Sequence, residues 1–550
     1  MQMGNKARKA ILGAVRVTAA AVVVLLVPSC SQTRSAEQSA STSSDGMGSD
    51  GMGFDVMEAT IEDVHEAYAN GTLTARELTQ MYLDRIEAYD KKGPQINCVI
   101  TLNPDALGTA DKLDAAFRQS GPVGPLHGIP IVLKDQIDMA GLPTTLGSVL
   151  FEDYVPTKDA FVVTKLKEAG AIILAKVTLG ELGGGDTFGS LFGETHNPYD
   201  LERTAGGSSG GTAAAVTANF ATLGIGQEGF ASIRRPATWN SIVGMRPTAG
   251  LVSRSGVYAG WPATNGSLGP MTRTVADLAR LLDVMVGYDP EDPITALGVG
   301  KAPETYVSSL VRDGLKGARI GILRESIGAD SEPDSRDFKD VTAIFDQAVA
   351  ELKAAGAEVV DPIVIPNVQA LLAKRSSTIR NVDDSTEAYL SRNPNSRFKT
   401  AKDIFNSPDF SKVRRRLSPE TRSVEEQEKA HYEYLVAREQ LMFHVMKVMA
   451  DHKLDAIVHK SVEHTPTLIK DGINPPYVTH KGVPHWNTFL VYAASIAVPA
   501  GFTAEGLPVG ITFFGRPYSE PTMIKLAYAY EQATQHRKPP PTAPAISKTR

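Results

Sequence analysis

The chain of 550 residues is long enough to bury at least one large hydrophobic core. Its composition, 42% hydrophobic and 21% charged, excludes a coiled coil and a disordered scaffold. The formal net charge is −6 and no long run of Lys or Arg occurs, so the charge distribution gives no support for a nucleic-acid partner.

The N-terminal end has the pattern of an export signal. Residues 1–29 carry basic side chains followed by an apolar run over residues 17–27. This run is too short for the roughly 20 residues of a membrane-spanning helix, so it predicts a signal peptide. Ser29 directly before Cys30 resembles the cleavage site of bacterial lipoproteins, in which the cysteine is lipidated. We therefore predict a cell-envelope lipoprotein attached to the membrane only through Cys30, with a secreted protein as the alternative.

The rest of the chain divides into a tether, one large unit and a tail. Residues 30–54 contain almost no large apolar side chain and are predicted to be a flexible tether. No second segment of comparable bias follows, so residues 55–541 are predicted to form a single catalytic domain. Residues 542–550 are predicted to be a flexible C-terminal tail.

The large unit alternates between strand-like and helical patterns. Thr74 and Glu77 form a capping box before an amphipathic helix, and a second helix is predicted over residues 338–355. Short apolar runs predict strands at 129–133, 171–175, 318–323 and 357–360. This alternation indicates an α/β fold in which helices cover a sheet.

A glycine-rich loop is the densest local signal. The sequence AGGSSGGTAAAVTANF begins at residue 205 and places four glycines around Ser208 and Ser209, before an Ala-rich stretch that can begin a helix. Such a loop could bind phosphate at a helix N-terminus. It lacks the lysine spacing of a P-loop and is not a G-x-G-x-x-G motif, so this interpretation is disfavoured.

Two further motifs accompany this loop. Lys134 lies in HGIPIVLKDQIDMAGLPTTLGS, and Ser232 lies in ASIRRPA. Together with HNPYDLERTAGGSSGG and IAVPAGFTAEGLPVGITFFGRPYSE, their order and spacing resemble the amidase signature family of serine hydrolases. The resemblance extends from about Glu58 to the C-terminal region. It implies the amidase signature fold, in which helices cover both faces of a large, mixed and twisted β-sheet.

The resemblance also implies a mechanism. Ser232 would be the nucleophile, Ser208 would relay its proton, and Lys134 would be the base of a Ser-Ser-Lys triad that needs no metal or organic cofactor. Lys134 must then be uncharged, which requires an enclosed site. In the family, the bond between Gly207 and Ser208 is cis. The expected reaction is hydrolysis of a linear carboxylic amide through an acyl-serine intermediate, with an ester or carbamate as the alternative substrate.

The segment before Ser232 departs from the family pattern. Family members have an Asp, a variable residue and two glycines there, whereas this chain has Glu228, Gly229, Phe230 and Ala231. The backbone N–H groups of the last three residues would form the oxyanion hole. We expect Phe230 and Ala231 to take backbone angles that glycine reaches more easily, or the loop to differ. This departure keeps a catalytically impaired envelope binding protein as an alternative.

Several other residues are assigned from the same comparison. Arg234 is expected to pair with Glu228 as structural support, as is Gly207, and Lys176 is interpreted as structural rather than catalytic. His459, Lys460 and Ser461 replace a usual Pro-Thr pair and are expected to alter substrate preference.

The partners follow from the same reasoning. The histidines do not show H-E-x-x-H spacing, so no metal site is predicted. The expected partner is a small-molecule amide. The export signal disfavours a role in the modification of charged tRNA, and the sequence leaves the oligomeric state open, a homodimer included.

Overall fold

The computed structural model describes residues 54–260, 262–263, 266–376, 382–414, 422–472 and 480–546. The predicted signal peptide, Cys30 and nearly all of the tether lie outside these ranges, so those assignments remain predictions. In the part of the chain that is described, no helix is both long enough and apolar enough to cross a bilayer.

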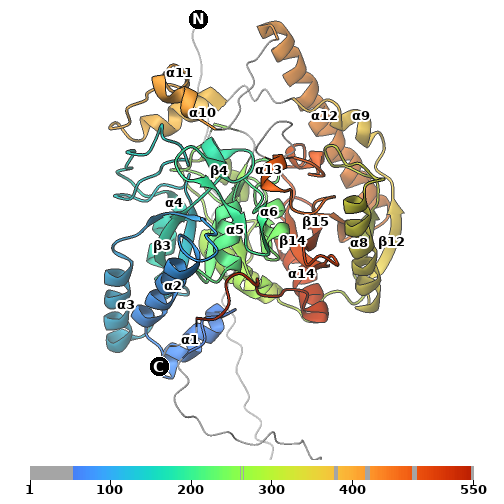
Figure 1. The fold of residues 1–550 in the computed structure, drawn as a ribbon. Coiled ribbons are helices and arrows are strands. Elements are labelled where there is room, and N and C mark those ends of the chain that lie inside the picture. The colour runs from blue at the N-terminus through green and yellow to red at the C-terminus, as the bar shows by residue number, and fades with distance from the viewer. Residues whose placement is uncertain are drawn as a thin grey trace, which may run out of the picture. The chain divides into compact units, whose positions relative to one another are not determined.

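The described chain is organised around a sheet of eleven strands in the order β1-β3-β2-β8-β10-β9-β14-β15-β13-β11-β12. Figure 1 shows β12 at the right of the view with α8 (Arg336–Ala354) beside it. β2 pairs in parallel with β3 and β8, β11 pairs in parallel with β12 and β13, and the remaining pairs are antiparallel. The strands are β1 Val99–Leu102, β2 Pro130–Lys134, β3 Ile172–Val177, β8 Leu223–Glu228, β9 Val243–Arg246, β10 Ser267–Thr272, β11 Arg319–Leu323, β12 Glu358–Ile363, β13 Ala456–Lys460, β14 Ser495–Phe502 and β15 Pro508–Phe514. The predicted α/β fold with a large mixed sheet is confirmed.

Helices pack against this sheet, and two separate two-stranded sheets, here called ribbons, accompany it. The helices are α1 Ile61–Ala69, α2 Ala75–Tyr89, α3 Ala106–Ser120, α4 Phe161–Glu168, α5 Gly210–Thr217, α6 Arg234–Trp239, α7 Val275–Met285, α8 Arg336–Ala354, α9 Val368–Leu372, α10 Val382–Ser391, α11 Ala401–Phe405, α12 Val424–Asp451, α13 Ile469–Gly472 and α14 Glu520–Thr534. The ribbons pair β4 Phe188–Gly189 with β5 Gly193–Glu194, and β6 His196–Asn197 with β7 Asp200–Thr204. The expected capping box opens α2, since Thr74 and Glu77 exchange hydrogen bonds.

The glycine-rich loop and the start of α5 approach the backbone of neighbouring segments very closely. A Cβ atom on Gly211 would lie 2.3 Å from the carbonyl oxygen of Thr178, and one on Gly207 would lie 2.3 Å from that of Gly185. No side chain fits at these distances, so both positions require glycine. The glycines therefore set the position of Ser208, which lies between them.

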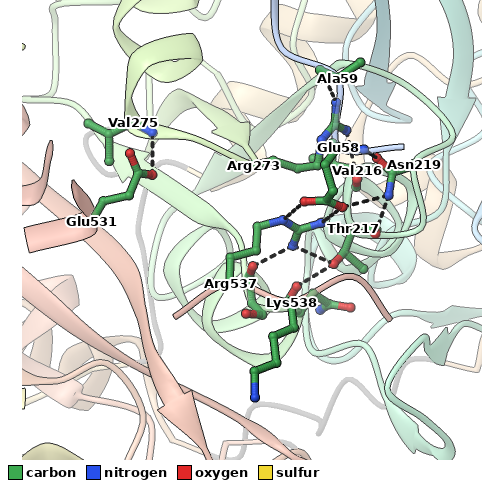
Figure 2. A network of polar contacts seen from close by, with 12 residues as sticks. Glu58, Ala59, Val216, Thr217, Asn219, Arg273, Val275, Glu531, Arg537 and Lys538 are labelled. Atoms are coloured by element: carbon green, nitrogen blue, oxygen red, sulfur yellow. Dashed lines mark hydrogen bonds and ion pairs between the residues drawn. The ribbon is translucent and has the colours of Figure 1, made fainter. Parts of the chain in front are cut away.

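A network of polar contacts holds the far end of α5 (Figure 2). Arg537, which follows α14, donates hydrogen bonds to the Thr217 hydroxyl at 3.0 Å and to the Ser241 carbonyl at 2.7 Å. Its guanidinium also pairs with both carboxylate oxygens of Glu58, at 2.6 and 2.8 Å. The Asn219 amide donates to the same carboxylate at 2.9 Å. Segments from both ends of the described chain therefore meet at the C-terminal end of α5.

The C-terminal segment continues to pack after this network. Arg85 of α2 donates to the carbonyl oxygens of Ala543 and Pro544 at 2.7 and 2.8 Å, and Ala543 is buried. Residues 543 and 544 are therefore packed against the domain, although they belong to the segment 542–550 that was predicted to be a flexible tail. Residues 547–550 lie outside the described chain.

Replacing Arg537 by Ala is expected to lower the free energy of unfolding by about 2 kcal/mol, because it leaves the partly buried Glu58 carboxylate without its cation. Urea unfolding followed by circular dichroism measures the change. Lys538→Ala is the matched control, since the Lys538 side chain is exposed. An equal loss in both variants would contradict a specific role for the Arg537 network.

Candidate active site

Lys134 ends β2 and is completely buried. Its Nζ atom lies 2.6 Å from Oγ of Ser208 and 3.2 Å from the carbonyl oxygen of Gln227. Burial holds the pKa of Lys134 well below its usual range, and the negative charge of Glu228 opposes this only in part. The amine therefore has neutral hydrogen-bond partners and an environment that favours its uncharged form.

Lys176, in the neighbouring strand β3, has a contrasting environment although it is equally buried. Its Nζ atom lies 3.1 Å from Oδ1 of Asp135 and donates a hydrogen bond to Oγ1 of Thr144 at 2.9 Å. The carboxylate compensates the ammonium charge directly. This ion pair supports the structural interpretation of Lys176 and distinguishes it from Lys134.

Ser208 lies between Lys134 and the turn at Glu181–Gly183. Its hydroxyl accepts a hydrogen bond from Lys134 and donates one to the carbonyl oxygen of Gly183 at 3.0 Å. The peptide bond between Gly207 and Ser208 is cis, as the resemblance implied. Ser208 is thus fully buried, with its hydroxyl in direct contact with the lysine amine.

Ser209 joins this loop to the segment that carries Ser232. The Ser209 N–H donates to the carbonyl oxygen of Ser232 at 3.1 Å, and its hydroxyl donates to the carbonyl of Gln227 at 3.2 Å. The N–H and the hydroxyl of Ser209 therefore both donate to backbone carbonyl oxygens. Ser232 lines a cavity that Gly207 also lines, so the structure brings all three predicted motifs to one place.

The backbone of the loop before Ser232 excludes the first of the two alternatives that its sequence left open. None of Gly229, Phe230 and Ala231 has a positive φ, so Phe230 and Ala231 do not occupy the left-handed region that favours glycine. Within the described ranges, the N–H groups of Phe230, Ala231 and Ser232 donate to no protein acceptor. Backbone donors beside a cavity and without acceptors suit an oxyanion.

The carboxylate of Glu228 holds this loop through hydrogen bonds and an ion pair. As expected, it pairs with Arg234, whose Nε donates to Oε1 at 2.9 Å. The other oxygen accepts the N–H groups of Ile233 and Arg234, both at 2.9 Å. Burial alone would raise the pKa of Glu228, but the charges of Arg234 and Arg246 and these hydrogen bonds hold it below its ordinary value. The ionised carboxylate therefore fixes both ends of the turn that contains Ser232.

A second ion pair that the sequence did not suggest supports the other side of the site. Arg235 lies 2.7 Å from Oδ1 of Asp186 and donates to the carbonyl oxygen of Gly207 at 2.9 Å. Arg235 follows Arg234 in the motif ASIRRPA, and that doubled arginine was the available sequence signal.

The cavity beside Ser232 has a volume of about 490 Å³. Its apolar lining comes from segments that are distant in sequence, and includes Leu182, Phe230, Tyr258, Ile404, Phe405 and Val483. Two arginines, Arg235 and Arg375, also line it. Arg375 was not singled out from the sequence, because it lies in a polar region that carries no motif.

The segment that replaces the usual Pro-Thr pair does not line this cavity. His459 lies in β13 with its ring 4.9 Å from that of Trp486, and neither Lys460 nor Ser461 is a lining residue. Burial and the charge of Arg234 lower the pKa of His459 to about 3. The expectation that these residues shape substrate preference is therefore wrong for direct contact. Among the described residues, no group of three or more His, Cys, Asp and Glu side chains is arranged to hold a metal ion.

Comparisons with known proteins agree with this architecture. The sequence matches the family described as Amidase over residues 77–524. It is 33% identical to a probable amidase of Arabidopsis thaliana, over 88% of this chain and 92% of that protein. It is also 33% identical to one component of the glutamyl-tRNA(Gln) amidotransferase of Methanosarcina barkeri, over 85% of this chain and 96% of the relative.

A solved structure gives the same result. The native peptide amidase of Stenotrophomonas maltophilia is similar with a TM-score of 0.76 and 34% identity, over 88% of this chain and 98% of that one. The chain belongs to the amidase signature family, and the resemblance inferred from its motifs is confirmed. It is therefore a hydrolase of the family that acts on carbon–nitrogen bonds.

The two buried lysines should respond differently to replacement. The unfolded chain binds a proton at Lys134 that the folded site disfavours, so this site loses stability as the pH falls below the ordinary lysine pKa. Lys134→Met has no such group. As the pH is lowered from 9 to 7, the free energy of unfolding of Lys134→Met should therefore rise relative to that of the wild type, by up to about 1.4 kcal/mol per pH unit.

Lys176→Met is the matched comparison. It should lose about 3 kcal/mol at pH 7, because Asp135 is left buried without its cation. Urea unfolding of the three proteins at both pH values measures these differences. A pH-independent difference between the wild type and Lys134→Met would contradict an uncharged Lys134.

Proposed function

We propose that this protein hydrolyses linear carboxylic amides through an acyl-enzyme intermediate on Ser232, with Ser208 and Lys134 completing a Ser-Ser-Lys triad. The observation that carries the proposal is the environment of Lys134. A lysine can act as a base only without its proton. Lys134 is buried against the Ser208 hydroxyl, and no carboxylate of the described residues is in contact with its amine. The ion-paired Lys176 lacks this property.

The proposed proton path runs from Ser232 through Ser208 to Lys134. It requires the Ser208 hydroxyl to turn its hydrogen from the Gly183 carbonyl oxygen to Nζ of Lys134, with which it is already in contact. As the oxygen of Ser232 bonds to the amide carbon, its proton passes to Ser208, and the proton of Ser208 passes to Nζ of Lys134. When the carbon–nitrogen bond breaks, the same path returns a proton to the leaving amine. Water then attacks the carbonyl carbon of the acyl-serine ester and gives a proton to Lys134 along the same path. When the bond between this carbon and the oxygen of Ser232 breaks, the proton returns to Ser232 and the acid is released.

Backbone donors stabilise the negative charge that develops on the substrate oxygen. The N–H groups of Phe230, Ala231 and Ser232 are suitable, because they have no protein acceptor among the described residues. Gly229 begins the same loop. The ionised Glu228 and its partner Arg234 fix this loop without touching the substrate.

The proposal predicts that Ser232→Ala abolishes hydrolysis of simple and aryl amides, reducing kcat/KM by a factor of about 10³ or more. Circular dichroism should show an unchanged fold. A fluorophosphonate probe should label the wild type but not Ser232→Ala. Ser120→Ala is the control, because the Ser120 hydroxyl lies on the exposed end of α3 and bonds only to the helix, so both labelling and activity should be kept. Equal activity in Ser232→Ala would overturn the assignment, and parallel esters and carbamates determine whether either is preferred.

We also propose that the protein is exported and anchored in the cell envelope through a lipid on Cys30. This rests on the N-terminal sequence alone. Cys30→Ser should move the protein from the membrane fraction to the soluble fraction after cell lysis, whereas Cys98→Ser should not, because Cys98 is a core thiol. Membrane association that survives Cys30→Ser would refute lipid anchoring.

A further inference from the structure

Arg375 places a guanidinium on the wall of the cavity beside Ser232. It follows α9, and its guanidinium carbon lies 4.3 Å from the centre of the Phe230 ring. One of its nitrogens donates to Nε2 of His485 across 3.5 Å, which is a long hydrogen bond. The aromatic face orients Arg375 but satisfies few of its five N–H donors.

The charge of Arg375 has no carboxylate partner among the described residues. The described lining of the cavity contains no Asp or Glu side chain. Arg235, the other arginine on the wall, already pairs with Asp186. Burial lowers the pKa of Arg375, and among the described residues the Tyr434 phenol opposes that effect but no carboxylate does. Arginine stays protonated in proteins, so the cavity carries a net positive charge at this point.

His485 does not supply the missing partner. Burial and the positive charge of Arg375 lower the pKa of His485 to about 4, so its ring is neutral at pH 7. A neutral ring can accept one hydrogen bond from the guanidinium but cannot compensate its charge. A half-buried cation with unused donors is a favourable position for an anionic ligand group.

We propose that the cavity takes amide substrates that carry a carboxylate, and that Arg375 binds this carboxylate. The inference rests on the proposed function, because it concerns the substrate of the same site. Phe230 connects the two features: its ring supports Arg375 while its backbone lies two residues before Ser232.

The rest of the cavity limits the body of the substrate. Its wall includes the apolar side chains of Leu182, Ile404, Phe405 and Val483, and the ring of Tyr258. These groups favour an aliphatic or aromatic body. The substrate class is therefore an apolar amide with one acidic group.

The carboxylate could belong to the acyl group or to the leaving amine, and two pairs of substrates separate these cases. For the acyl group, the p-nitroanilide of succinic acid with its second carboxylate free is compared with that of butyric acid. For the leaving amine, p-acetamidobenzoate is compared with p-methylacetanilide. The wild type should have the higher kcat/KM for the acidic member of one pair.

Arg375→Gln should reduce kcat/KM for that acidic substrate by about 10- to 100-fold and change the neutral one less than about threefold. Arg375→Lys should recover part of the loss. Arg397→Gln is the matched control, because Arg397 also stacks on a phenylalanine, 4.7 Å from the Phe398 ring, but does not line this cavity. Equal losses for acidic and neutral substrates, or no preference for either acid in the wild type, would overturn the proposal.

A binding measurement keeps this result separate from catalysis. Calorimetry with Ser232→Ala protein, which cannot form the acyl enzyme, should show tighter binding of the acidic compound of the preferred pair than of its neutral counterpart. Adding Arg375→Gln should remove that advantage. If no amide is hydrolysed but this difference persists, the proposed function fails and carboxylate recognition stands. If the difference is absent, carboxylate recognition fails even where hydrolysis occurs.

Discussion

The chemistry proposed for this protein depends on keeping one amine out of water. The end of β2 places Lys134 in the interior, where a charged ammonium is poorly solvated and Ser208 offers only a neutral hydroxyl. Lys176, one strand away, shows that the same fold can stabilise a buried lysine by ion pairing. The two sites therefore differ in the partner of the lysine amine and not in how far the lysine is buried. Among the described residues no carboxylate contacts the Lys134 amine, and this disfavours its charged form at the expense of stability.

The sequence was sufficient to predict the fold class but not the order of the strands. Continuous apolar runs correctly marked β2, β3 and β11, because strands buried on both faces need no polar alternation. The run at β12 was also correctly marked, although β12 is an edge strand in which only Ile363 is buried. The neighbours of each strand depend on contacts between segments that are far apart in sequence. Thus β9 pairs with β14 in the middle of the sheet, although β9 ends at Arg246 and β14 begins only at Ser495. Local periodicity carries no information about such pairing.

The candidate site was predictable where its residues belong to motifs. Lys134, Ser208 and the pair of Glu228 with Arg234 were found because their spacing is characteristic of the family, and the structure brings them together. Backbone geometry was harder to foresee: the loop accepts Phe230 without a positive φ. Arg375 escaped prediction because its importance comes from what surrounds it, and a missing carboxylate partner leaves no trace in a sequence. His459 was overinterpreted, since its ring packs inside the protein.

The network around Arg537 has a consequence for how the molecule is made. α5 carries the serine loop at its N-terminal end, and its C-terminal end is held by Arg537 together with Glu58 (Figure 2). These contacts join residues from opposite ends of the domain, so they form only after the segment around Arg537 has been synthesised. A nascent chain that lacks this segment has the motifs of all three predicted catalytic residues but not the contacts that hold the far end of α5. Ordering of the site is thereby coupled to synthesis of the whole domain.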